Sequence, residues 1–299
     1  LWVDDEEADL PAAALPMNGN AASPNGDSWA FSVWRSKNVR EQRQPGYHAV
    51  EVGLHLGDIQ ADQFFRLADI SRRYSRGRAR TSFEQNIVFR WVRDEDLYAL
   101  WRDLGRAGLG EAGAHEITDI VSCPGTDSCK LGITASMGLG EELIQTLKEM
   151  NIDDPLIREM HIKISGCPNS CGQHHLANIG FHGGTLRAEG KMLPAYEIFL
   201  GGQYENTGGN TRLGNRIYIR LPAKRVPEGL QKILALYLRE RLAGERFNEF
   251  YARAGKGPFE ETLQDLHVGG QFGDDPDLFV DWNRSEPYVL ERGEGECMS

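Results

Sequence analysis

The chain has 299 residues, a net charge of −11, and 40% apolar against 26% charged residues. This composition is typical of a soluble globular protein with room for one large or two medium-sized cores. No apolar run approaches about 18 residues, and no secretory signal pattern is visible, so we expect no membrane partner. Five cysteines are too few for a disulfide scaffold.

Acidic groups are concentrated at the two ends of the chain. Residues 1–27 hold six Asp or Glu and no Lys or Arg, and residues 274–299 hold eight against two Arg, which leaves the region between them nearly neutral. Proteins that bind nucleic acid usually show a basic face instead. We therefore expect no nucleic-acid partner.

The N-terminal part is predicted to be an acidic linker or extension over 1–27, followed by a patterned region over 28–112. Alternating apolar residues predict four strands, at 47–56, 79–83, 86–92 and 115–121. Apolar residues at helical spacing predict two helices, at 59–75 with Asp58 as N-cap and at 94–109. The order β-α-β-β-α-β is typical of a ferredoxin-like half-domain.

A second region, 113–272, combines helices with short strands, and an acidic tail follows over 273–299. The predicted strands lie at 161–165, 178–181, 196–200 and 217–221. The predicted helices lie at 131–150, 227–243 and 245–254. The cysteines fall at the ends of these elements, and the fold class is α+β.

Four of the five cysteines form two close pairs, Cys123-x5-Cys129 and, 37 residues later, Cys167-x3-Cys171. Zinc sites usually use C-x2–4-C pairs, so the wider first pair is awkward for zinc. A 4Fe–4S cluster is larger and tolerates wider, unequal spacings. The pattern favours such a cluster, and a zinc ion, one disulfide per pair or four buried thiols are the alternatives.

Glycine and proline accompany both pairs. Glycine permits close approach of the backbone, and proline stiffens a turn. The residues concerned are Gly125, Gly132, Gly166 and Gly172 with Pro124 and Pro168.

Two segments resemble the sirohaem-dependent nitrite and sulfite reductases. The first is Ile164-Ser-Gly-Cys-Pro-Asn-Ser-Cys-Gly-Gln173, taken with the upstream cysteine pair, which resembles the cluster motif of that family. The second runs from Gly77 to Phe89 and resembles the R-x-T-x-x-Q-N signature of the family's ferredoxin-like repeat. Together they cover about residues 29–270.

The resemblance implies a six-electron reduction of nitrite to ammonia or of sulfite to sulfide, with a 4Fe–4S cluster and sirohaem as cofactors. Cys171 takes the role of the cysteine whose thiolate serves both the cluster and the sirohaem iron. Cys123, Cys129 and Cys167 are then ligands of the cluster alone. Asn169 matches the family position that contacts the macrocycle.

Further residues are candidates for sirohaem binding or proton transfer. Arg80 aligns with the signature Arg and belongs to a basic group suited to carboxylates or to an acidic donor protein. Gln85 and Asn86 follow it, with turn capping as the alternative. His174 and His175 are candidate proton relays, with simple hydrogen bonding as the alternative. The basic group consists of Arg72, Arg73, Arg76, Arg78 and Arg80.

Three other residues are expected to play no direct part. His161 and His182 lie on strand patterns and are interpreted as structural. Cys297 lies among acidic residues and is interpreted as an exposed bystander.

The resemblance covers one ferredoxin-like repeat and one cofactor module, which corresponds to the C-terminal half of the family's enzymes. The other half supplies most substrate-binding Arg and Lys residues, so no catalytic residue is assigned here. The chain starts with Leu, which suggests a fragment, with a natural half-length protein that dimerises as the alternative. We expect the N-terminal half to be a partner.

The electron donor is expected to be a separate protein, either a ferredoxin or a flavoprotein subunit, because the sequence has no dinucleotide-binding fingerprint. Thiolates that assemble a cluster need a reducing compartment, which favours the cytoplasm. Two other functions are alternatives: an enzyme of corrin ring contraction with a similar cluster architecture, and a non-catalytic iron–sulfur electron-transfer module.

Overall fold

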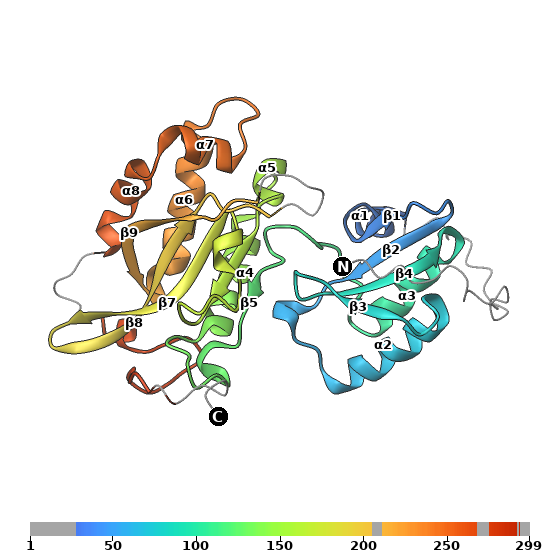
Figure 1. Ribbon diagram of the computed structural model, residues 1–299, viewed down its shortest axis with the longest axis horizontal. Helices are drawn as coiled ribbons and strands as arrows, with labels where there is room; N and C mark the ends of the chain where they lie inside the picture. The colour runs from blue at the N-terminus through green and yellow to red at the C-terminus, as the bar shows by residue number, and fades with distance from the viewer. Residues whose placement is uncertain (1–27, 205–210, 268–274, 292, 294–299) are drawn as a thin grey trace. The chain divides into compact units, whose positions relative to one another are not determined.

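A computed structural model describes residues 28–204, 211–267, 275–291 and 293 (Figure 1). They form two compact units. The first contains residues up to 53 together with 59–82 and 86–112, and the second contains 54–58, 83–85 and the chain from 113 onward. The predicted extension 1–27 and Cys297 lie outside the described residues.

The first unit is built on a four-stranded antiparallel sheet of order β1-β2-β4-β3. Its strands are β1 (Val39–Glu41), β2 (Tyr47–Val52), β3 (Ala79–Thr81) and β4 (Ile87–Arg93). Its helices are α1 (Ser28–Asn38), α2 (Ala61–Tyr74) and α3 (Leu97–Arg106). Helix α2 begins after Gln60, which forms a capping box with Gln63, so the predicted cap at Asp58 was wrong.

The core of this unit follows from two periodicities. Every second residue of β2 is buried, and Val50 and Val52 have no exposed surface. The buried residues of α2 and α3 recur at helical spacing, as with Leu100 and Leu104. Apolar faces of helix and sheet therefore pack together.

Two strand predictions for the first unit were wrong. Residues 115–120 form turns, held by hydrogen bonds such as that from the Asp119 amide to the Glu116 carbonyl, and only β5 (Val121–Ser122) is a strand. β5 belongs to the second sheet, and the fourth strand of the first sheet is β1, which was not predicted. The strand predicted over 47–56 ends at Val52, and a short 3₁₀ turn follows at His55–Gly57, in which Leu56 adopts a left-handed conformation (φ 52°).

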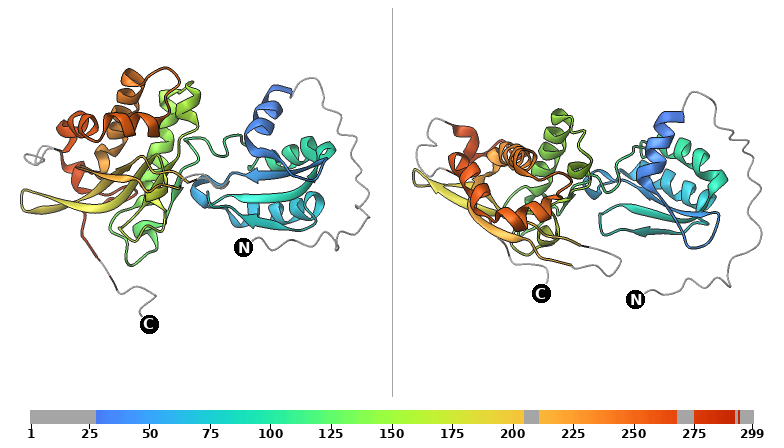
Figure 2. Two further views of the ribbon diagram at one scale, coloured as in Figure 1. Left: turned by 45° about the horizontal axis from the view of Figure 1, so that its top comes forward. Right: turned by 90° about the horizontal axis from the view of Figure 1, so that it is seen from above.

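The second unit contains a five-stranded sheet of order β5-β6-β7-β8-β9, in which β5, β6 and β7 are parallel and the rest antiparallel. Figure 2 shows residues 179–200, in yellow, as a long hairpin that extends from the rest of this unit. The remaining strands are β6 (Ile162–Ser165), β7 (Ile179–Ala188), β8 (Lys191–Leu200) and β9 (Asn215–Pro222). The helices are α4 (Ser136–Met150), α5 (Pro155–Arg158), α6 (Val226–Glu240), α7 (Phe247–Ala254) and α8 (Gly257–His267). Helix α8 was not predicted, and α4 begins five residues later than expected.

The two faces of this sheet differ in character. Ile162 and Ile164 of β6 belong to the large apolar core, which also takes in the buried faces of α4, α6 and α8. Lys163 and Ser165 alternate with them, and Ser165 pairs in register with His182. One face of the sheet is therefore covered by helices, and the other carries polar and charged side chains.

The described part of the predicted acidic tail, 275–291, is packed on the second unit. Leu278 is buried with Ala188 and Leu193, and the Trp282 indole donates to the Ala223 carbonyl at 3.0 Å. The chain as a whole mixes helices and strands, which confirms the α+β prediction. None of the described helices is long and apolar enough to cross a bilayer.

Candidate functional site

The two cysteine pairs lie on loops that follow neighbouring parallel strands. Cys123 comes directly after β5, and Cys167 comes two residues after β6. The carboxyl ends of parallel neighbours meet at the same edge of a sheet, so the two loops lie side by side. The Gly166 amide donates to the Cys123 Sγ at 3.1 Å, and the Cys123 amide donates to the Ile164 carbonyl at 3.2 Å.

The loops approach each other so closely that side chains are excluded at several positions. A Cβ on Gly166 would lie 2.6 Å from the Gly125 Cα. Gly125 itself has φ 53°, and a Cβ there would lie 2.4 Å from the Ser136 Oγ. A Cβ on Gly172 would lie 1.8 Å from the Ile164 carbonyl oxygen. Glycine is therefore required for this backbone arrangement.

All four cysteines of the two loops are free thiols, which disagrees with one disulfide per pair. Cys123 and Cys167 are buried, whereas Cys129 and Cys171 are exposed. The pKa of Cys171 is raised, first by burial and then by the charges of the other three thiols, so Cys171 lies within electrostatic reach of each of them.

The sulfur atoms are not gathered as closely as the ligands of a bound zinc ion. Four thiolates about 2.3 Å from one zinc ion would lie about 3.8 Å apart. Within the described part of the chain, the cysteine sulfurs form no set of three within 4.8 Å of one another. Four thiols on loops of unequal spacing fit the ligand set of an iron–sulfur cluster.

The C-terminal segment braces the first cysteine loop. Arg284 donates to the Thr126 carbonyl at 2.9 Å, and the Tyr288 hydroxyl donates to the Ile133 carbonyl at 2.8 Å. The buried carboxylate of Asp281 accepts the Ala135 amide at 2.8 Å. Sequence reasoning missed these residues, because composition marked 273–299 only as an acidic tail and gave no sign of its contacts.

Gln85 supports the same loop. Its side-chain amide donates to the Ser122 carbonyl at 2.9 Å and accepts the Ser122 amide at 3.0 Å, one residue before Cys123. Gln85 is in the left-handed conformation (φ 63°), which turns its side chain toward β5 within the second unit. The amide is thus engaged with the backbone that carries a cysteine.

Two other candidates from the same motif belong to the first unit. Asn86 is fully buried, and its side chain donates to the Glu51 carboxylate at 3.2 Å. Arg80 lies exposed on β3, opposite Val88. Within the basic group around it, Arg72 is paired with Asp69 at 2.6 Å, and Arg73 is paired with Asp103. These pairs reduce the positive charge that this surface offers.

His174 and His175 follow Cys171 on a short 3₁₀ turn, with ring centroids 4.0 Å apart. His174 is fully buried, and its Nδ1 lies 2.9 Å from the Ser165 Oγ. Burial and, secondarily, the charges of the neighbouring histidines lower its pKa to about 3, so His174 is neutral near pH 7. Burial also lowers the pKa of His175, which is only partly buried.

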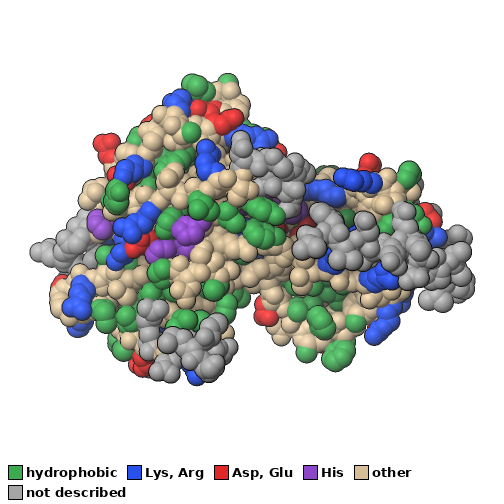
Figure 3. Space-filling model, in the orientation of Figure 1, with side chains coloured by type: hydrophobic (Ala, Val, Ile, Leu, Met, Phe, Trp, Pro, Cys, Tyr) green, Lys and Arg blue, Asp and Glu red, His purple; other side chains and the backbone are tan. Residues whose placement is uncertain are grey.

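Polar side chains continue across the open face of the sheet. His182 lies 5.0 Å from the ring of His174, and its Nε2 lies 3.7 Å from the Glu197 carboxylate. Glu197 in turn is paired with Arg216 and Arg220. Figure 3 shows histidine side chains on this unit next to basic and acidic ones. Asn169 is exposed between the second pair of cysteines.

Two family models match the chain. The nitrite/sulfite reductase ferredoxin-like half domain matches residues 40–107, and the nitrite and sulphite reductase 4Fe-4S domain matches residues 113–278. The chain belongs to the nitrite and sulfite reductase family. All four paired cysteines fall within the matched 4Fe-4S domain, and the cofactors of the family are a 4Fe–4S cluster and sirohaem.

Curated relatives in this reductase family are longer than the chain. A chloroplastic ferredoxin–nitrite reductase of Oryza sativa is 31% identical over 82% of the chain and 41% of the relative. A ferredoxin–nitrite reductase of Synechococcus elongatus is 29% identical over 66% of the chain and 37% of the relative. A sulfite reductase [ferredoxin] of Mycobacterium tuberculosis is 25% identical over 70% and 38%. The chain thus spans about two fifths of their length.

The fold of the chain agrees with solved structures. It matches the NirA protein of Mycobacterium tuberculosis with a TM-score of 0.63 and 23% identity, over 75% of the chain and 41% of NirA. It matches dissimilatory sulfite reductase I with a TM-score of 0.58 and 14% identity, over 85% of the chain and 78% of the matched structure. At these identities the likeness establishes the fold.

Proposed function

We propose that this chain is the cluster-bearing part of a sirohaem-dependent reductase that takes nitrite to ammonia or sulfite to sulfide by six electrons. The observation that carries the proposal is the pair of loops after β5 and β6, which bring four free thiols together inside the matched 4Fe-4S domain. When bound, the cluster supplies single electrons to the sirohaem, on which the anion is reduced.

The cysteines have different surroundings, which supports different roles. Cys123 and Cys167 are buried and suit ligation of the cluster alone, together with Cys129. Cys129 and Cys171 are both exposed, so exposure permits a second metal centre at either thiolate. The resemblance of the Cys167–Cys171 loop to the family motif is what assigns the bridge to the sirohaem iron to Cys171. Asn169 is exposed two residues before Cys171 on the same loop, and we assign it the contact with the macrocycle.

The remaining candidates separate into supporting and functional residues. Gln85 is best described as a positioning residue, because both ends of its amide bind the Ser122 backbone. His175 is the better proton relay, because His174 is buried and its pKa of about 3 disfavours the cationic form. Arg80 is exposed and keeps its proposed role toward the sirohaem carboxylates.

The substrate and the donor follow from the relatives. Several relatives are named ferredoxin–nitrite reductases, and one is named a sulfite reductase [ferredoxin], which supports either anion as substrate and a ferredoxin as donor. The chain spans about two fifths of their length, and we propose that a further part of the reductase fold supplies the side chains that bind the anion.

Sirohaem binding tests this assignment. Sirohaem is titrated anaerobically into the cluster-loaded chain, and its absorption and magnetic coupling to the cluster are recorded. We expect one sirohaem per chain, and a larger loss of sirohaem affinity in Cys171→Ser than in Cys129→Ser, since both thiols are exposed. Equal losses would contradict the bridging role, and a cluster-loaded chain that binds no sirohaem would contradict the proposed function.

A further inference from the structure

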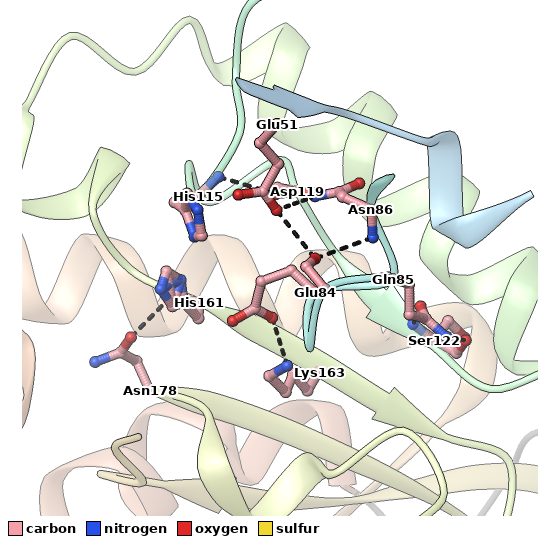
Figure 4. A network of polar contacts seen from close by, with 11 residues as sticks. Glu51, Glu84, Gln85, Asn86, His115, Asp119, Ser122, His161, Lys163 and Asn178 are labelled. Atoms are coloured by element: carbon pink, nitrogen blue, oxygen red, sulfur yellow. Dashed lines mark hydrogen bonds and ion pairs between the residues drawn. The ribbon is translucent and has the colours of Figure 1, made fainter. Parts of the chain in front are cut away.

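A second group of metal-ligand side chains lies at the opposite end of β6. One carboxylate oxygen of Glu84 and one ring nitrogen each of His115 and His161 all lie within 4.8 Å of one another. Figure 4 shows the two imidazoles and the carboxylate turned toward one another. They come from three separate segments of the second unit: a turn before β4, the loop after residue 113, and the residue before β6.

The two histidines are anchored through their backbone amides. The His161 amide donates to the Asn178 side chain at 2.7 Å, at the point where β6 and β7 begin to pair. The His115 amide donates to the Asp119 carboxylate at 2.9 Å, and His115 has φ 63°, the left-handed region. These two contacts fix the backbone positions of His115 and His161, and neither of them involves a ring nitrogen.

The third ligand-type residue, Glu84, has a buried cation behind it. Lys163 is 1% exposed, and its ammonium donates to one Glu84 carboxylate oxygen at 2.6 Å. The ammonium also lies 4.3 Å from the centre of the Phe83 ring. Carboxylates that bind metals are commonly oriented by a hydrogen-bond donor on the other oxygen, and Lys163 occupies that position.

The ligand set is chemically specific. Two imidazoles and one carboxylate are the protein ligands of many open zinc and non-haem iron sites, in contrast to the all-thiolate set at the other end of the strand. Ligand atoms about 2.1 Å from a tetrahedral ion lie about 3.4 Å apart, so the three atoms need to move together by about 1.4 Å at most. Side-chain rotation of three partly buried residues provides that movement.

Charge and access also favour a cation. Glu84 and Asp119 bring two carboxylates to the group, and the Lys163 ammonium binds one of them. Glu84, His161 and Lys163 line a cavity of about 690 Å³, which gives an ion a route to the site and room for a water ligand. Farther along the cavity, the charges of Arg212 and Arg246 are balanced by those of Glu159 and Glu249. The positive charge of Lys163 opposes metal binding. Its ammonium binds one oxygen of the Glu84 carboxylate, which leaves the other oxygen for the metal ion.

We propose that Glu84, His115 and His161 bind a divalent transition-metal ion of the zinc class, with at least one coordination position open to the cavity. The site uses none of the residues assigned to the cluster or to sirohaem. It therefore stands or falls independently of the proposed reductase function.

Cobalt(II) is the probe, since it replaces zinc and its spectrum reports the ligands. The apo chain is titrated anaerobically with Co²⁺. Thiolate ligands give an intense charge-transfer band, whereas a site of imidazole and carboxylate gives weak ligand-field bands alone. We expect a second class of bound Co²⁺, one per chain, without the thiolate band.

Variants identify which residues hold this second ion. His115→Asn keeps a residue type that tolerates the left-handed backbone and is expected to weaken the second class by more than about tenfold. His161→Asn is expected to do the same. His55→Asn is the matched control, because His55 is a half-exposed histidine of the same unit that is paired with a carboxylate, that of Glu141 at 2.8 Å.

Circular dichroism verifies that each variant is folded before its titration is interpreted. Loss of the second class in the His115 and His161 variants, with the thiolate band and the His55→Asn titration unchanged, supports the site. Titrations of His115→Asn and His161→Asn that match the unmodified chain, or the absence of a second class in that chain, would overturn it.

Discussion

The two ends of strand β6 place opposite kinds of ligand on one short element. At its carboxyl end the chain runs into Gly166 and Cys167, where four thiols gather on glycine-lined loops. At its amino end lie His161 and, across from it, Glu84 and His115. The first end is shaped by close backbone packing, and the second by side-chain hydrogen bonds and a buried ion pair.

The difference shows how a single strand serves two chemistries. Parallel neighbours align backbone ends, so loops after β5 and β6 are brought together whatever their side chains. The backbone arrangement at the carboxyl end therefore depends on the absence of side chains at its glycines. The amino end has the reverse sensitivity, because its geometry depends on individual side chains such as Lys163.

The largest effect is expected from removing a buried cluster ligand. Cys167→Ser replaces a soft thiolate with a hydroxyl, and we expect loss of nearly all cluster iron and of the associated visible absorption. Iron and acid-labile sulfide analysis measures it. Cys297→Ser is the control, since Cys297 stands outside both pairs. Equal iron content in the two variants would show that Cys167 is no ligand.

Backbone crowding at the cysteine end is tested by a pair of glycine variants. Gly125 (φ 53°) and Gly190 (φ 75°) both lie in the left-handed region, but only Gly125 has atoms within 4 Å of an added Cβ. Gly190→Ala is expected to cost about 1 kcal/mol from backbone strain. Gly125→Ala adds overpacking and is expected to cost about 1–3 kcal/mol more. Chemical denaturation measures both, and equal costs would contradict the packing argument.

A smaller effect is expected from the support of the first loop. Gln85→Ala removes two hydrogen bonds to Ser122 and is expected to cost about 1–3 kcal/mol and to lower cluster loading. Gln145→Ala, on the exposed face of α4, is the matched control with an expected cost within about 0.5 kcal/mol. Unchanged stability and loading in Gln85→Ala would argue against a positioning role.

The smallest expected effects are on the pH dependence of stability, which should differ in sign between the two ends of β6. Near the amino end, Asp154 caps α5 and binds Arg241, whose hydrogen bond holds the pKa of Asp154 below its usual value. Its stabilisation is present above the unfolded pKa of about 3.9 and is lost as pH falls toward the folded pKa. At the cysteine end, burial raises the pKa of Asp281, so its ionisation disfavours folding above the folded pKa.

Two asparagine variants read out this contrast. Unfolding free energies are measured from about pH 6 down to about pH 3. The Asp154 carboxylate makes the protein less stable as pH falls, so Asp154→Asn should make the unfolding free energy fall less on acidification. Asp281 has the opposite effect, so Asp281→Asn should make the unfolding free energy fall more on acidification. Shifts of the same sign in both variants would contradict the assigned pKa directions.

The thiols could be predicted from the sequence because spacing and residue type both mark them. Cys123, Cys129, Cys167 and Cys171 form two close pairs, and no tertiary information is needed to see that four soft ligands belong together. The α+β class also followed from local periodicity. The fourth strand of the first sheet did not, because β1 has only three residues and too little pattern to predict.

The proximity of Glu84, His115 and His161 could not be predicted from the sequence, for a physical reason. Glu84, His115 and His161 are separated by 31 and 46 positions, and the parallel pairing of β6 with β7 places His161 at the sheet edge only in the folded chain. The brace from Arg284, Asp281 and Tyr288 was missed likewise, because its contacts span about 150 positions. Long β7 and β8 were underestimated because Gly183, Gly184 and Pro194 interrupt the apolar alternation.

The central claim, that the two loops hold an iron–sulfur cluster, is tested most directly by metal analysis with visible spectroscopy. The purified chain is reconstituted anaerobically, and iron, acid-labile sulfide and zinc are counted per chain. The account predicts about four iron and four sulfide with a broad charge-transfer absorption that disappears in Cys167→Ser. One colourless zinc ion held by the four cysteines, with no sulfide, would contradict it.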